Sequence, residues 1–235
     1  MHAREWLSPA SVVYFVEKLL NTRTGQKLSC MFDWTILPVG NPDGYIYSQT
    51  TDRMWRKNRR INNGSNCDGV DLNRNWDYLW GQSGSSTNTC DQTYQGISPF
   101  SEPEVLDLSG FIKAFSNDIL AYFSVHAYGR YWLVPYGSGG KATNFDELLR
   151  VAKIGVNAIG NDQWQVGNTQ EVSNYGSSGG AEDWVLSHTN VTYAYCLELM
   201  PGSVDNGFKA NSHDIKTSGE EFWRGITAAV VAMKP

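Results

Sequence analysis

The sequence predicts an α/β fold: a single domain built around a mixed, mostly parallel twisted sheet flanked by helices. Helix-like and strand-like segments alternate along the 235 residues, which is the pattern of strands joined by helical crossovers. Two apolar runs, ILAYFSV and VTYAYCL, have the length and the β-branched and aromatic content of buried strands. No internal repeat or low-complexity linker divides the chain, so we expect one domain over residues 1–235.

The composition argues against several classes of protein. The net charge is −5 at pH 7, and this mild acidity argues against nucleic acid as the main partner. No run of eighteen or more apolar residues occurs, so we expect no membrane span. The first residues include Arg4 and Glu5 and no apolar run, so we expect no signal peptide within this sequence. We expect a monomer that binds neither nucleic acid nor a membrane.

The first hundred residues predict a helix, a strand and a long irregular region. The helix should begin near Ser8, which can cap it, with Pro9 in its first turn. A strand should follow around residues 31–40, MFDWTILPVG, and end in a turn at 41–44, NPDG. Residues 51–100 are rich in Asn, Gly, Ser and Arg with little periodicity, and long ordered loops are often functional. The apolar stripe of the helix contains Val12, Val13, Phe15, Val16, Leu19 and Leu20.

Three further helices are predicted. Ser101 should cap the first, with Glu104 completing a capping box. Gly160 should end the second, which begins near residue 144. The last should begin at Ser218, with Glu221 completing its box. Its apolar stripe contains Phe222, Trp223, Ile226, Val230 and Met233.

Two polar side chains end the strand-like runs. His126 follows ILAYFSV, and Glu198 follows VTYAYCL. Ligands of open α/β sheets bind beyond the carboxyl ends of the strands, so we expect both residues at a binding site. The alternatives are a hydrogen-bonded strand-end histidine and a glutamate in a surface salt bridge.

The four cysteines can pair in three ways. Cys67 and Cys90 lie in polar, loop-like segments, so they are the better candidates for a disulfide. Cys30 and Cys196 each adjoin a strand-like apolar run, and we expect both to be buried free thiols.

The chain opens with His2 and Glu5, a His-x-x-Glu pair that can hold a metal ion. Zinc is bound by histidine and carboxylate side chains, and a catalytic site keeps one position for water. His2, Glu5 and His126 would supply such a set. His188 and His213 have no carboxylate at ligand spacing. Taken separately, the pair and His126 are more often ordinary side chains than ligands.

Several motifs together resemble the zinc carboxypeptidases of the pancreatic A/B family (peptidase M14). HAREW, NPDGY, the WRK step, DLNRNW, HAYG, NYGSSGGAEDW and the glutamate of CLEL follow in the order of that family, from His2 almost to the C-terminus. The resemblance implies the carboxypeptidase fold, one zinc ion per chain, and release of single residues from the C-termini of peptides and proteins. The family also carries a disulfide where Cys67 and Cys90 stand.

The resemblance implies a role for each residue of the site. His2, Glu5 and His126 would be the zinc ligands, and two imidazoles with one carboxylate leave the metal positive enough to acidify its water and polarise a carbonyl. Asp71 resembles the carboxylate that lies behind the first histidine ligand and fixes the tautomer of its imidazole. Taken alone, Asp71 would indicate an Asx turn in a polar loop.

Glu198 resembles the catalytic glutamate, which takes a proton from the zinc-bound water and later delivers it to the leaving amine. Arg56 resembles the arginine that steadies the developing oxyanion. The alternative for its segment, RMWRKNRR, is a basic face or a nucleic-acid patch, and we expect most of its other charges to be solvated. Asn73, Arg74 and Tyr175 resemble the residues that hold the terminal carboxylate of the substrate.

The residue that the enzyme would release depends on the floor of its pocket. By resemblance Glu182 contributes to that floor, where an acidic residue accompanies C-terminal Lys or Arg. Basic-specific members of the family usually carry Asp there, so Glu is a departure, and we expect a weak preference for basic C-terminal residues. Arg4 and Tyr128 resemble outer contacts of the substrate.

The sequence departs from the family at its start. In the family a stretch with strands and a helix precedes HAREW, so we expect a catalytic domain that is incomplete at its N-terminus, with the first strands and helix missing from the sheet.

Two functions follow: an active zinc carboxypeptidase, or a catalytically inactive truncated remnant or peptide-binding module. A serine hydrolase is disfavoured because no Gly-x-Ser-x-Gly elbow in a strand-to-helix turn joins a plausible His and Asp. Family and disulfide imply an extracellular, secreted protein whose signal and pro-segment lie outside this sequence.

Overall fold

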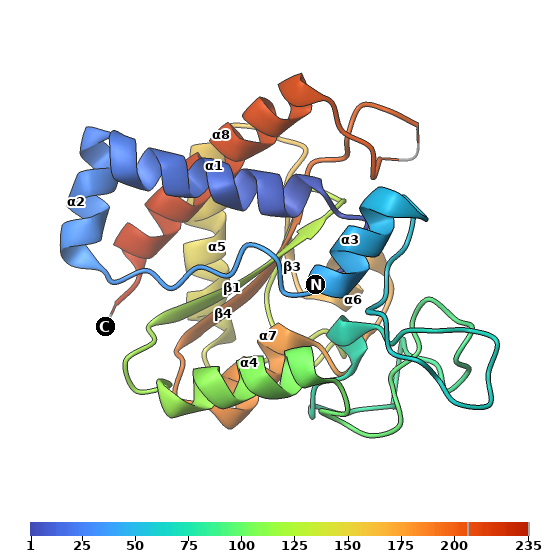
Figure 1. Ribbon diagram of the computed structural model, residues 1–235. Helices are drawn as coiled ribbons and strands as arrows, with labels where there is room; N and C mark the ends of the chain where they lie inside the picture. The colour runs from blue at the N-terminus through green and yellow to red at the C-terminus, as the bar shows by residue number, and fades with distance from the viewer. Residues whose placement is uncertain (206, 235) are drawn as a thin grey trace.

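The computed structural model describes residues 1–205 and 207–234 of the chain. Its centre is a four-stranded sheet in the order β1-β4-β2-β3 (Figure 1). The strands are β1 (Ala121–Ala127), β2 (Tyr131–Leu133), β3 (Gln165–Gly167) and β4 (Tyr193–Leu199). β1 is parallel to β4 and β2 is parallel to β3, whereas β2 and β4 are antiparallel. The predicted mixed, mostly parallel sheet is therefore confirmed.

Helices cover both faces of this sheet. α1 (Leu7–Asn21), α5 (Phe145–Ile159) and α8 (Ser212–Ala232) pack on one face, and α4 (Pro103–Ala114) and α7 (Ala181–His188) pack on the other (Figure 1). Successive residues of a strand point to opposite faces. In β4, Tyr195 and Leu197 join the core under α1, α5 and α8, whereas Ala194 joins the core under α4 and α7. Glu198 therefore points to the side of α4 and α7. Among the residues described, no helix is long and apolar enough to cross a membrane.

Several predicted elements are confirmed. α1 carries Pro9 in its first turn, and α5 ends at Gly160, whose φ of 70° is the left-handed conformation of a helix stop. β1 and β4 lie where the two apolar runs predicted strands. Residues 51–100 form a long irregular region with one short 3-10 helix, η1 (Leu72–Arg74).

Two predicted N-caps were wrong because the serines lie inside their helices. α1 begins one residue before Ser8, and no side chain caps it. α8 begins at Ser212, six residues before Ser218, and Asn211 caps it in a box with Asp214. Ser218 Oγ instead accepts a 2.9 Å hydrogen bond from Ser11 Oγ where α8 crosses α1. A hydroxyl that is paired across a helix interface is not free to cap a helix end.

The N-terminus of α4 also differs from the prediction. Glu102, not Ser101, is the N-cap residue, no side chain caps the helix, and Pro103 is its first residue. The Ser101 hydroxyl donates to Glu102 Oε1 at 2.7 Å. The expected capping box with Glu104 is therefore absent.

The predicted strand at residues 31–40 does not form a ladder. From Met31 to Leu37 the residues alternate between exposed and half-buried, as in a strand, and Phe32, Trp34 and Ile36 pack on the core. No strand of the described chain pairs with this segment, so its backbone is extended but unpaired. It joins α2 (Arg23–Met31) to α3 (Pro42–Thr50).

The predicted turn at 41–44 is the start of α3. Asn41 caps this helix by accepting from the Gly44 amide at 3.0 Å, and Pro42 occupies its first turn. The NPDG signal therefore marks a helix start and not a reversal of the chain. One further short helix, α6 (Thr169–Ser173), follows β3.

The cysteines follow the prediction with one exception. Cys67 and Cys90 form a disulfide, and Cys196 is a buried free thiol on β4. Cys30 is exposed, which corrects the expectation that it is buried. It lies near the end of α2, a helix that packs on α1 through Leu28 and leaves its other side to solvent.

Candidate active site

Three donor side chains meet at the carboxyl end of β1. His2 Nδ1 lies 2.6 Å from Glu5 Oε1, His126 Nδ1 lies 3.0 Å from Glu5 Oε2, and the two Nδ1 atoms are 3.1 Å apart. All three side chains are buried. They form the one group of three or more potential metal ligands found among the described residues.

The chemistry of this set suits zinc. Zinc bonds of about 2.0–2.1 Å to nitrogen and oxygen place tetrahedral ligands roughly 3.3 Å apart, close to the distances between these donors. The outer nitrogens are also held, because His2 Nε2 lies 3.0 Å from Asp71 Oδ1 and His126 Nε2 lies 3.0 Å from Ser124 Oγ. Each Nδ1 is thereby turned inward. A partner on the far nitrogen is the arrangement that orients histidine ligands in metal sites.

The charges around the donors favour the ligand forms. Burial lowers the pKa of His2, and the neighbouring Arg56 lowers it further, which favours the neutral imidazole. Burial alone would raise the pKa of Glu5, but His2 and His126 hold it well below its ordinary value. Neutral imidazoles and an ionised carboxylate are the forms that bind a metal.

The ligand segment at the start of the chain is fastened by hydrogen bonds to α3 and to the following loop. The Ala3 amide donates to the Arg56 carbonyl at 3.0 Å, and the Ala3 carbonyl accepts from Ser48 Oγ at 3.1 Å. Asn41 Nδ2 donates to the Met1 carbonyl at 2.9 Å. These bonds fasten residues 1–3 to the side chains of Asn41 and Ser48 and to the backbone of Arg56.

Arg53 braces the same segment from outside. Its Nη1 donates to the Arg4 carbonyl at 2.8 Å and its Nη2 donates to the Phe208 carbonyl at 2.7 Å. The guanidinium also lies 3.8 Å from the centre of the Trp6 ring. One side chain thus connects the ligand turn with the loop before α8.

Asp71 and Arg56 form a buried ion pair behind His2. Arg56 Nε and Nη2 donate to Asp71 Oδ2 at 3.1 and 2.8 Å. Burial would raise the pKa of Asp71, yet Arg56 and His2 hold it well below its ordinary value. Arg56 Nη1 lies 4.0 Å from Glu5 Oε1. The carboxylate therefore fixes a histidine and an arginine at the same time.

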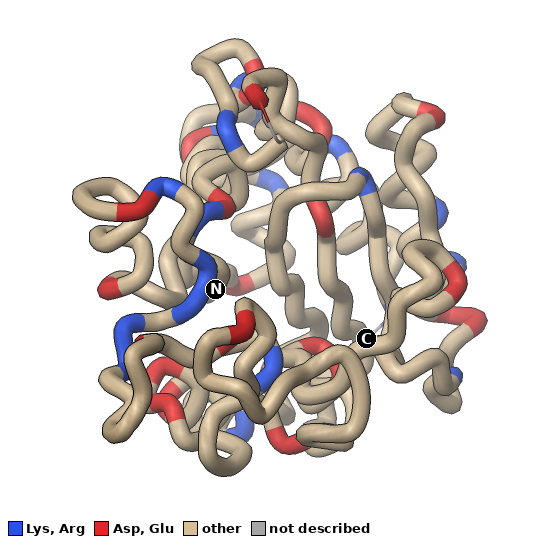
Figure 2. The backbone as a smooth tube through the Cα atoms, turned by 90° about the vertical axis from the view of Figure 1, so that its right-hand side faces the viewer, with Lys and Arg blue, Asp and Glu red and all other residues tan. Residues whose placement is uncertain are grey.

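The basic run that contains Arg56 passes beside the N-terminus (Figure 2). Its other charges are mostly paired, which corrects the expectation that they are solvated. Arg59 contacts Asp68, Arg60 contacts Glu102, and the buried Lys57 donates to a backbone carbonyl.

Glu198 lies beside His126 on the neighbouring strand. The two residues are partners in the parallel register of β1 and β4, so their side chains leave the sheet on the same face. Burial and then the charge of Glu5 raise the pKa of Glu198 to about 8. The sequence prediction that His126 and Glu198 share a site at the strand ends is supported by this register.

Asn73, Arg74 and Tyr175 come together from two distant segments. Arg74 Nε and the Tyr175 hydroxyl both donate to the Gly84 carbonyl, at 2.7 and 2.9 Å. Asn73 Oδ1 accepts from the Ala181 amide at the start of α7. Asn73 and Arg74 are buried, whereas Tyr175 is 47% exposed. The three side chains thus surround one corner, with the tyrosine on its open side.

Glu182 and Asp183 begin α7 with different surroundings. Asp183 accepts from the Gly137 amide at 2.9 and 3.1 Å, and burial followed by the charge of Glu182 raises its pKa well above the ordinary value. Glu182 is 8% exposed, and its Oε2 has no hydrogen-bond partner among the described residues. Its charge also contributes to the raised pKa values of Cys196 and Tyr122, after burial. Glu182 is therefore a buried carboxylate near the site face of β1 and β4.

Arg4 and Tyr128 meet at one aromatic ring. The Arg4 guanidinium lies 4.4 Å from the centre of the Phe208 ring, and the Tyr128 ring lies 4.9 Å from it. Gly207 permits this contact, because a Cβ there would lie 2.6 Å from the Tyr128 ring. Tyr128 is 40% exposed, so this cluster borders solvent.

Sequence reasoning missed two groups of supporting residues. Ser124 stands two positions before His126, and period-two alternation would have placed both on one face of the strand. Asn41, Ser48 and Arg53 hold the ligand segment, but no local pattern connects them with residues 1–4. Their role depends on how α3 and the loop after it pack.

Comparison with known proteins gives one consistent result. A family model described as zinc carboxypeptidase matches residues 1–225. A zinc carboxypeptidase of Simulium vittatum is 39% identical over 228 residues, which are 94% of this chain and 74% of that protein. Human carboxypeptidase O is 36% identical, with 98% of this chain and 63% of that protein covered. The chain spans between about half and three-quarters of the length of the curated relatives that it matches.

Solved structures share the fold. The carboxypeptidase A of Helicoverpa armigera superposes with a TM-score of 0.92 at 35% identity, covering 98% of this chain and 58% of that chain. Bovine thrombin-activatable fibrinolysis inhibitor, solved in complex with a tick carboxypeptidase inhibitor, gives a TM-score of 0.90 at 33% identity, covering 98% and 78%.

Proposed function

Because this chain belongs to the zinc carboxypeptidase family, we propose that it is a metallocarboxypeptidase that releases one residue at a time from the C-termini of peptides and proteins. The observation that carries the proposal is the convergence of His2, Glu5 and His126 beside Glu198. These three donors would hold one zinc ion per chain. When bound, zinc acidifies a water molecule and polarises a carbonyl oxygen.

Glu198 is the proposed general base and acid. It takes a proton from the attacking water and delivers it to the nitrogen of the leaving residue. A carboxylate with high proton affinity suits this exchange, and burial raises the pKa of Glu198 to about 8 in the protein alone. A nearby cation lowers such a pKa toward neutrality, where proton transfer in both directions is efficient.

Arg56 is the proposed donor to the oxyanion. Its Nε and Nη2 are fixed by Asp71, which sets the orientation of the guanidinium. Its Nη1 is too far from Glu5 Oε1, at 4.0 Å, for a hydrogen bond, so a donor remains for the developing charge. A charged donor held in place before the reaction stabilises a transition state without reorganisation.

Asn73, Arg74 and Tyr175 are the proposed clamp for the terminal carboxylate of the substrate. The buried guanidinium of Arg74 supplies the charge, and the exposed Tyr175 closes the open side. An internal peptide bond offers no carboxylate to such a clamp, which accounts for release of the last residue alone. Arg4 and Tyr128, which border solvent, would contact residues further from the end.

Glu182 supports a preference for C-terminal Lys or Arg. A buried carboxylate oxygen without a partner is costly, and a cationic side chain in the pocket would satisfy it. We expect peptides that end in Arg to be hydrolysed with a higher kcat/KM than matched peptides that end in Phe. Glu182→Leu should reverse this order, and a clear preference of the wild type for Phe would contradict the assignment.

The disulfide between Cys67 and Cys90 supports secretion, because such bonds persist in oxidising compartments. We propose that the protein acts outside the cell as a monomer. Its partners would be the C-termini of peptides and proteins.

The central test combines metal binding with hydrolysis. The 235-residue chain should bind one zinc ion, lose it to a chelator, and release single residues from peptides. Glu198→Gln should bind zinc as the wild type does and lose about 10²–10⁴-fold in kcat. A folded wild type without zinc binding or hydrolysis would instead favour a non-catalytic, peptide-binding role.

A further inference from the structure

The chain contains two acceptor motifs for N-linked glycans that the proposed catalysis does not use. They are Asn63-Gly64-Ser65 and Asn190-Val191-Thr192, and in neither is the middle residue proline. A glycan is bulky and needs a surface position in the folded protein. Both asparagines are exposed, so the surroundings of each side chain decide which one can carry a sugar at no cost to the fold.

The Asn63 side chain lies at the tip of an open turn. It makes no hydrogen bond with another residue of the described chain, so its amide nitrogen is free. Gly64 follows with a φ of 82°, and a Cβ on it would have no described atom within 4 Å. The left-handed conformation that glycine permits turns the backbone sharply here, and the space beyond the turn is open.

The base of the same turn is fixed. Ser65 Oγ lies 2.7 Å from Thr89 Oγ1 and accepts from the Cys67 amide at 3.0 Å. Asn62, which is buried, donates from Nδ2 to the Cys67 carbonyl at 3.0 Å. The turn is therefore held to the disulfide loop from beneath, and a sugar at its tip would disturb none of these bonds.

Asn190 is held differently. Its Nδ2 donates to Asn117 Oδ1 at 2.6 Å, and the next residue, Val191, is buried in the core under α4 and α7. The Thr192 carbonyl accepts from Asn144 Nδ2 at 2.9 Å, directly before β4 begins. A sugar on Asn190 Nδ2 would replace one of its hydrogens and crowd the bond to Asn117, so the folded chain should disfavour it.

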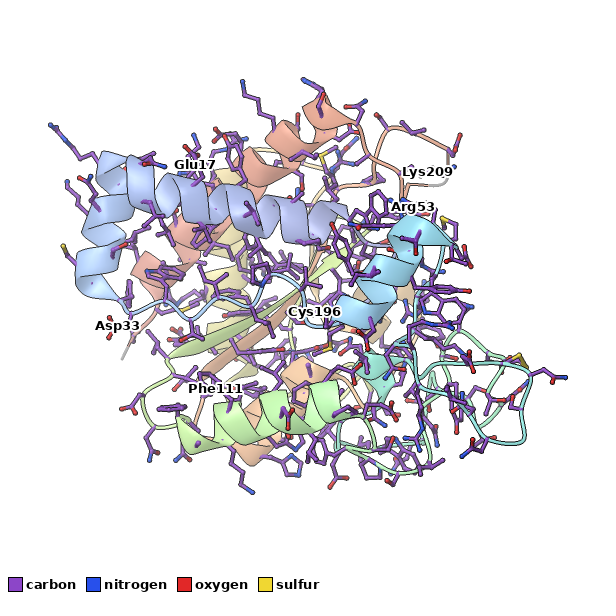
Figure 3. All side chains as sticks on the ribbon, viewed as in Figure 1. Glu17, Asp33, Arg53, Phe111, Cys196 and Lys209 are labelled. Carbon is purple, nitrogen blue, oxygen red and sulfur yellow. A yellow bond between two sulfur atoms is a disulfide. The ribbon has the colours of Figure 1, made fainter. Side chains whose placement is uncertain are left out.

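The turn at Asn63 belongs to a part of the molecule that projects from its body. The irregular region of residues 51–100, cyan to green in Figure 1, extends to one side of the sheet and helices. Figure 3 shows the disulfide as a yellow bond near the outer end of this region. None of residues 62–66 lines the apolar groove beside the outer edge of β1, so the exposure of Asn63 does not depend on that edge.

An exposed apolar side chain accompanies the acceptor. Ile61 stands two positions before Asn63 and is 74% exposed, the largest fraction for a large apolar side chain among the described residues. A glycan is solubilising, and one attached at Asn63 would shield Ile61 from other proteins.

We propose that Asn63 is an acceptor for an N-linked glycan, in preference to Asn190. The inference rests on the proposed secretion, because the glycan is attached in the oxidising compartment where the Cys67–Cys90 disulfide forms. The donor is a lipid-linked oligosaccharide diphosphate. Asn63 Nδ2 forms a bond to the anomeric carbon of the first N-acetylglucosamine, the bond from that carbon to the diphosphate breaks, the lipid diphosphate leaves with the bonding electrons, and the amide gives up one proton.

The test expresses the 235-residue chain behind a secretion signal in human cells that make only high-mannose glycans. The intact mass is measured before and after N-glycosidase treatment. Endoglycosidase H followed by peptide mapping then locates each asparagine that retains one N-acetylglucosamine. The chain is taken from the medium and from the cells, so retention within the cells does not remove the readout.

We expect sugar on Asn63 in most of the secreted chains. Asn63→Gln and Ser65→Ala should each abolish it, whereas Ser65→Thr keeps the hydroxyl and the motif and should retain it. Asn190→Gln is the matched control and should leave the sugar on Asn63 unchanged. A chain without sugar, or occupancy at Asn190 equal to or above that at Asn63, would overturn the inference.

The same samples separate this inference from the proposed function. The added signal delivers the chain to the compartment, so a bare Asn63 counts against the acceptor site and not against secretion or hydrolysis. Asn63→Gln should keep the kcat/KM of the wild type, because Asn63 belongs to none of the groups assigned to catalysis or substrate binding. A wild type with sugar on Asn63 and no hydrolysis would refute the proposed activity and leave the acceptor site supported.

Discussion

The two sides of β1 are organised in opposite ways. At its carboxyl end, His2, Glu5, Asp71 and Arg56 form what we call the polar corner, in which every side chain has a charged or hydrogen-bonding partner. Along its outer edge runs an apolar groove lined by Phe15, Phe111 and Phe222, among others, and residues 33–40 opposite make no backbone–backbone hydrogen bond with another described residue. Directional bonds fix the geometry of the polar corner, whereas the groove is defined by its shape and its apolar surface. Removal of one partner should therefore cost more in the polar corner than at the exposed surface of the groove.

Asp71→Ala should have the largest effect, because it removes both hydrogen bonds from Arg56 to a carboxylate and the partner of His2 Nε2. We expect a loss of about 3–5 kcal/mol in the free energy of unfolding and about 10–100-fold weaker zinc binding. Urea denaturation and a zinc competition titration measure the two losses. Asp71→Asn keeps an acceptor for His2 and should bind zinc more tightly than Asp71→Ala. If the alanine variant equalled the wild type in both measurements, the polar corner would not be held as we describe.

The disulfide should rank next, because it closes the irregular region that supplies Asp71 and Arg56. Its cysteines are 23 residues apart, and a loop of that size predicts a loss of about 3 kcal/mol when Cys67 and Cys90 are both replaced by serine. Chemical denaturation without reductant gives the value. As a control, Cys30→Ser removes an exposed thiol and should change the free energy of unfolding by less than about 0.5 kcal/mol. If Cys30→Ser lost as much stability as the variant without Cys67 and Cys90, the measured loss could not be assigned to the disulfide.

Asn41→Ala should have an intermediate effect. The variant loses the cap of α3 and the hydrogen bonds to the Met1 and Lys57 carbonyls. We expect about 1–2 kcal/mol from the cap and weaker zinc binding, since Met1 adjoins the first ligand. Thr50→Ala, on the exposed end of the same helix, is the control and should leave zinc binding unchanged. If Asn41→Ala bound zinc as tightly as the wild type, the hydrogen bond that anchors Met1 would not contribute to the metal site, and this prediction would be wrong.

Glu147→Gln should have the smallest effect, and it compares a half-buried arginine–carboxylate pair with the more deeply buried pair of Arg56 and Asp71. The hydrogen bond from Arg150 holds the pKa of Glu147 at about 2 instead of 4.5. A lowered carboxyl pKa adds stability above the unfolded-state pKa, and that stability is lost as the pH falls from about 4.5 toward 2. Because both side chains are partly open to solvent, water screens the pair, and we expect only a slight change in the urea midpoint at pH 7 that disappears at pH 2. If Glu147→Gln lowered the free energy of unfolding as much as Asp71→Ala does, the cost of losing a carboxylate partner would not depend on burial, contrary to our expectation.

The sequence predicted the elements whose signal is local and strong. β1 and β4 follow from uninterrupted apolar runs, and α5 ends at the glycine that its pattern indicated. The short strands β2 and β3 were not predicted, because three residues carry too little pattern to distinguish a strand from a loop. Their pairing depends on β4 and on each other.

The segment at 31–40 illustrates where a local pattern is insufficient. Its alternation of exposed and half-buried residues is that of a strand, but a strand also needs a neighbour to take its hydrogen bonds. The helix starts were misplaced for a related reason: Ser218 has the composition of a cap, and its packing against Ser11 decided otherwise.

For the site, residue order and strand ends predicted that His2, Glu5, His126 and Glu198 belong to one site, and the structure brings the first three together beside the strand that carries Glu198. The convergence of Arg74 and Tyr175 on the Gly84 carbonyl could not be read from spacing, because 101 positions (74 to 175) separate the two side chains. Long-range approach of this kind is set by the fold as a whole.

The parallel register of β1 and β4 also bears on how such a protein can diversify. His126 and Glu198 are separated by one strand spacing of about 4.8 Å, and main-chain hydrogen bonds fix that spacing whatever side chains surround it. Glu182 lies on a different element, α7. Under the roles that we propose, exchange of residue 182 would change the accepted end group while His126 and Glu198 keep their separation, so selectivity and chemistry could evolve independently.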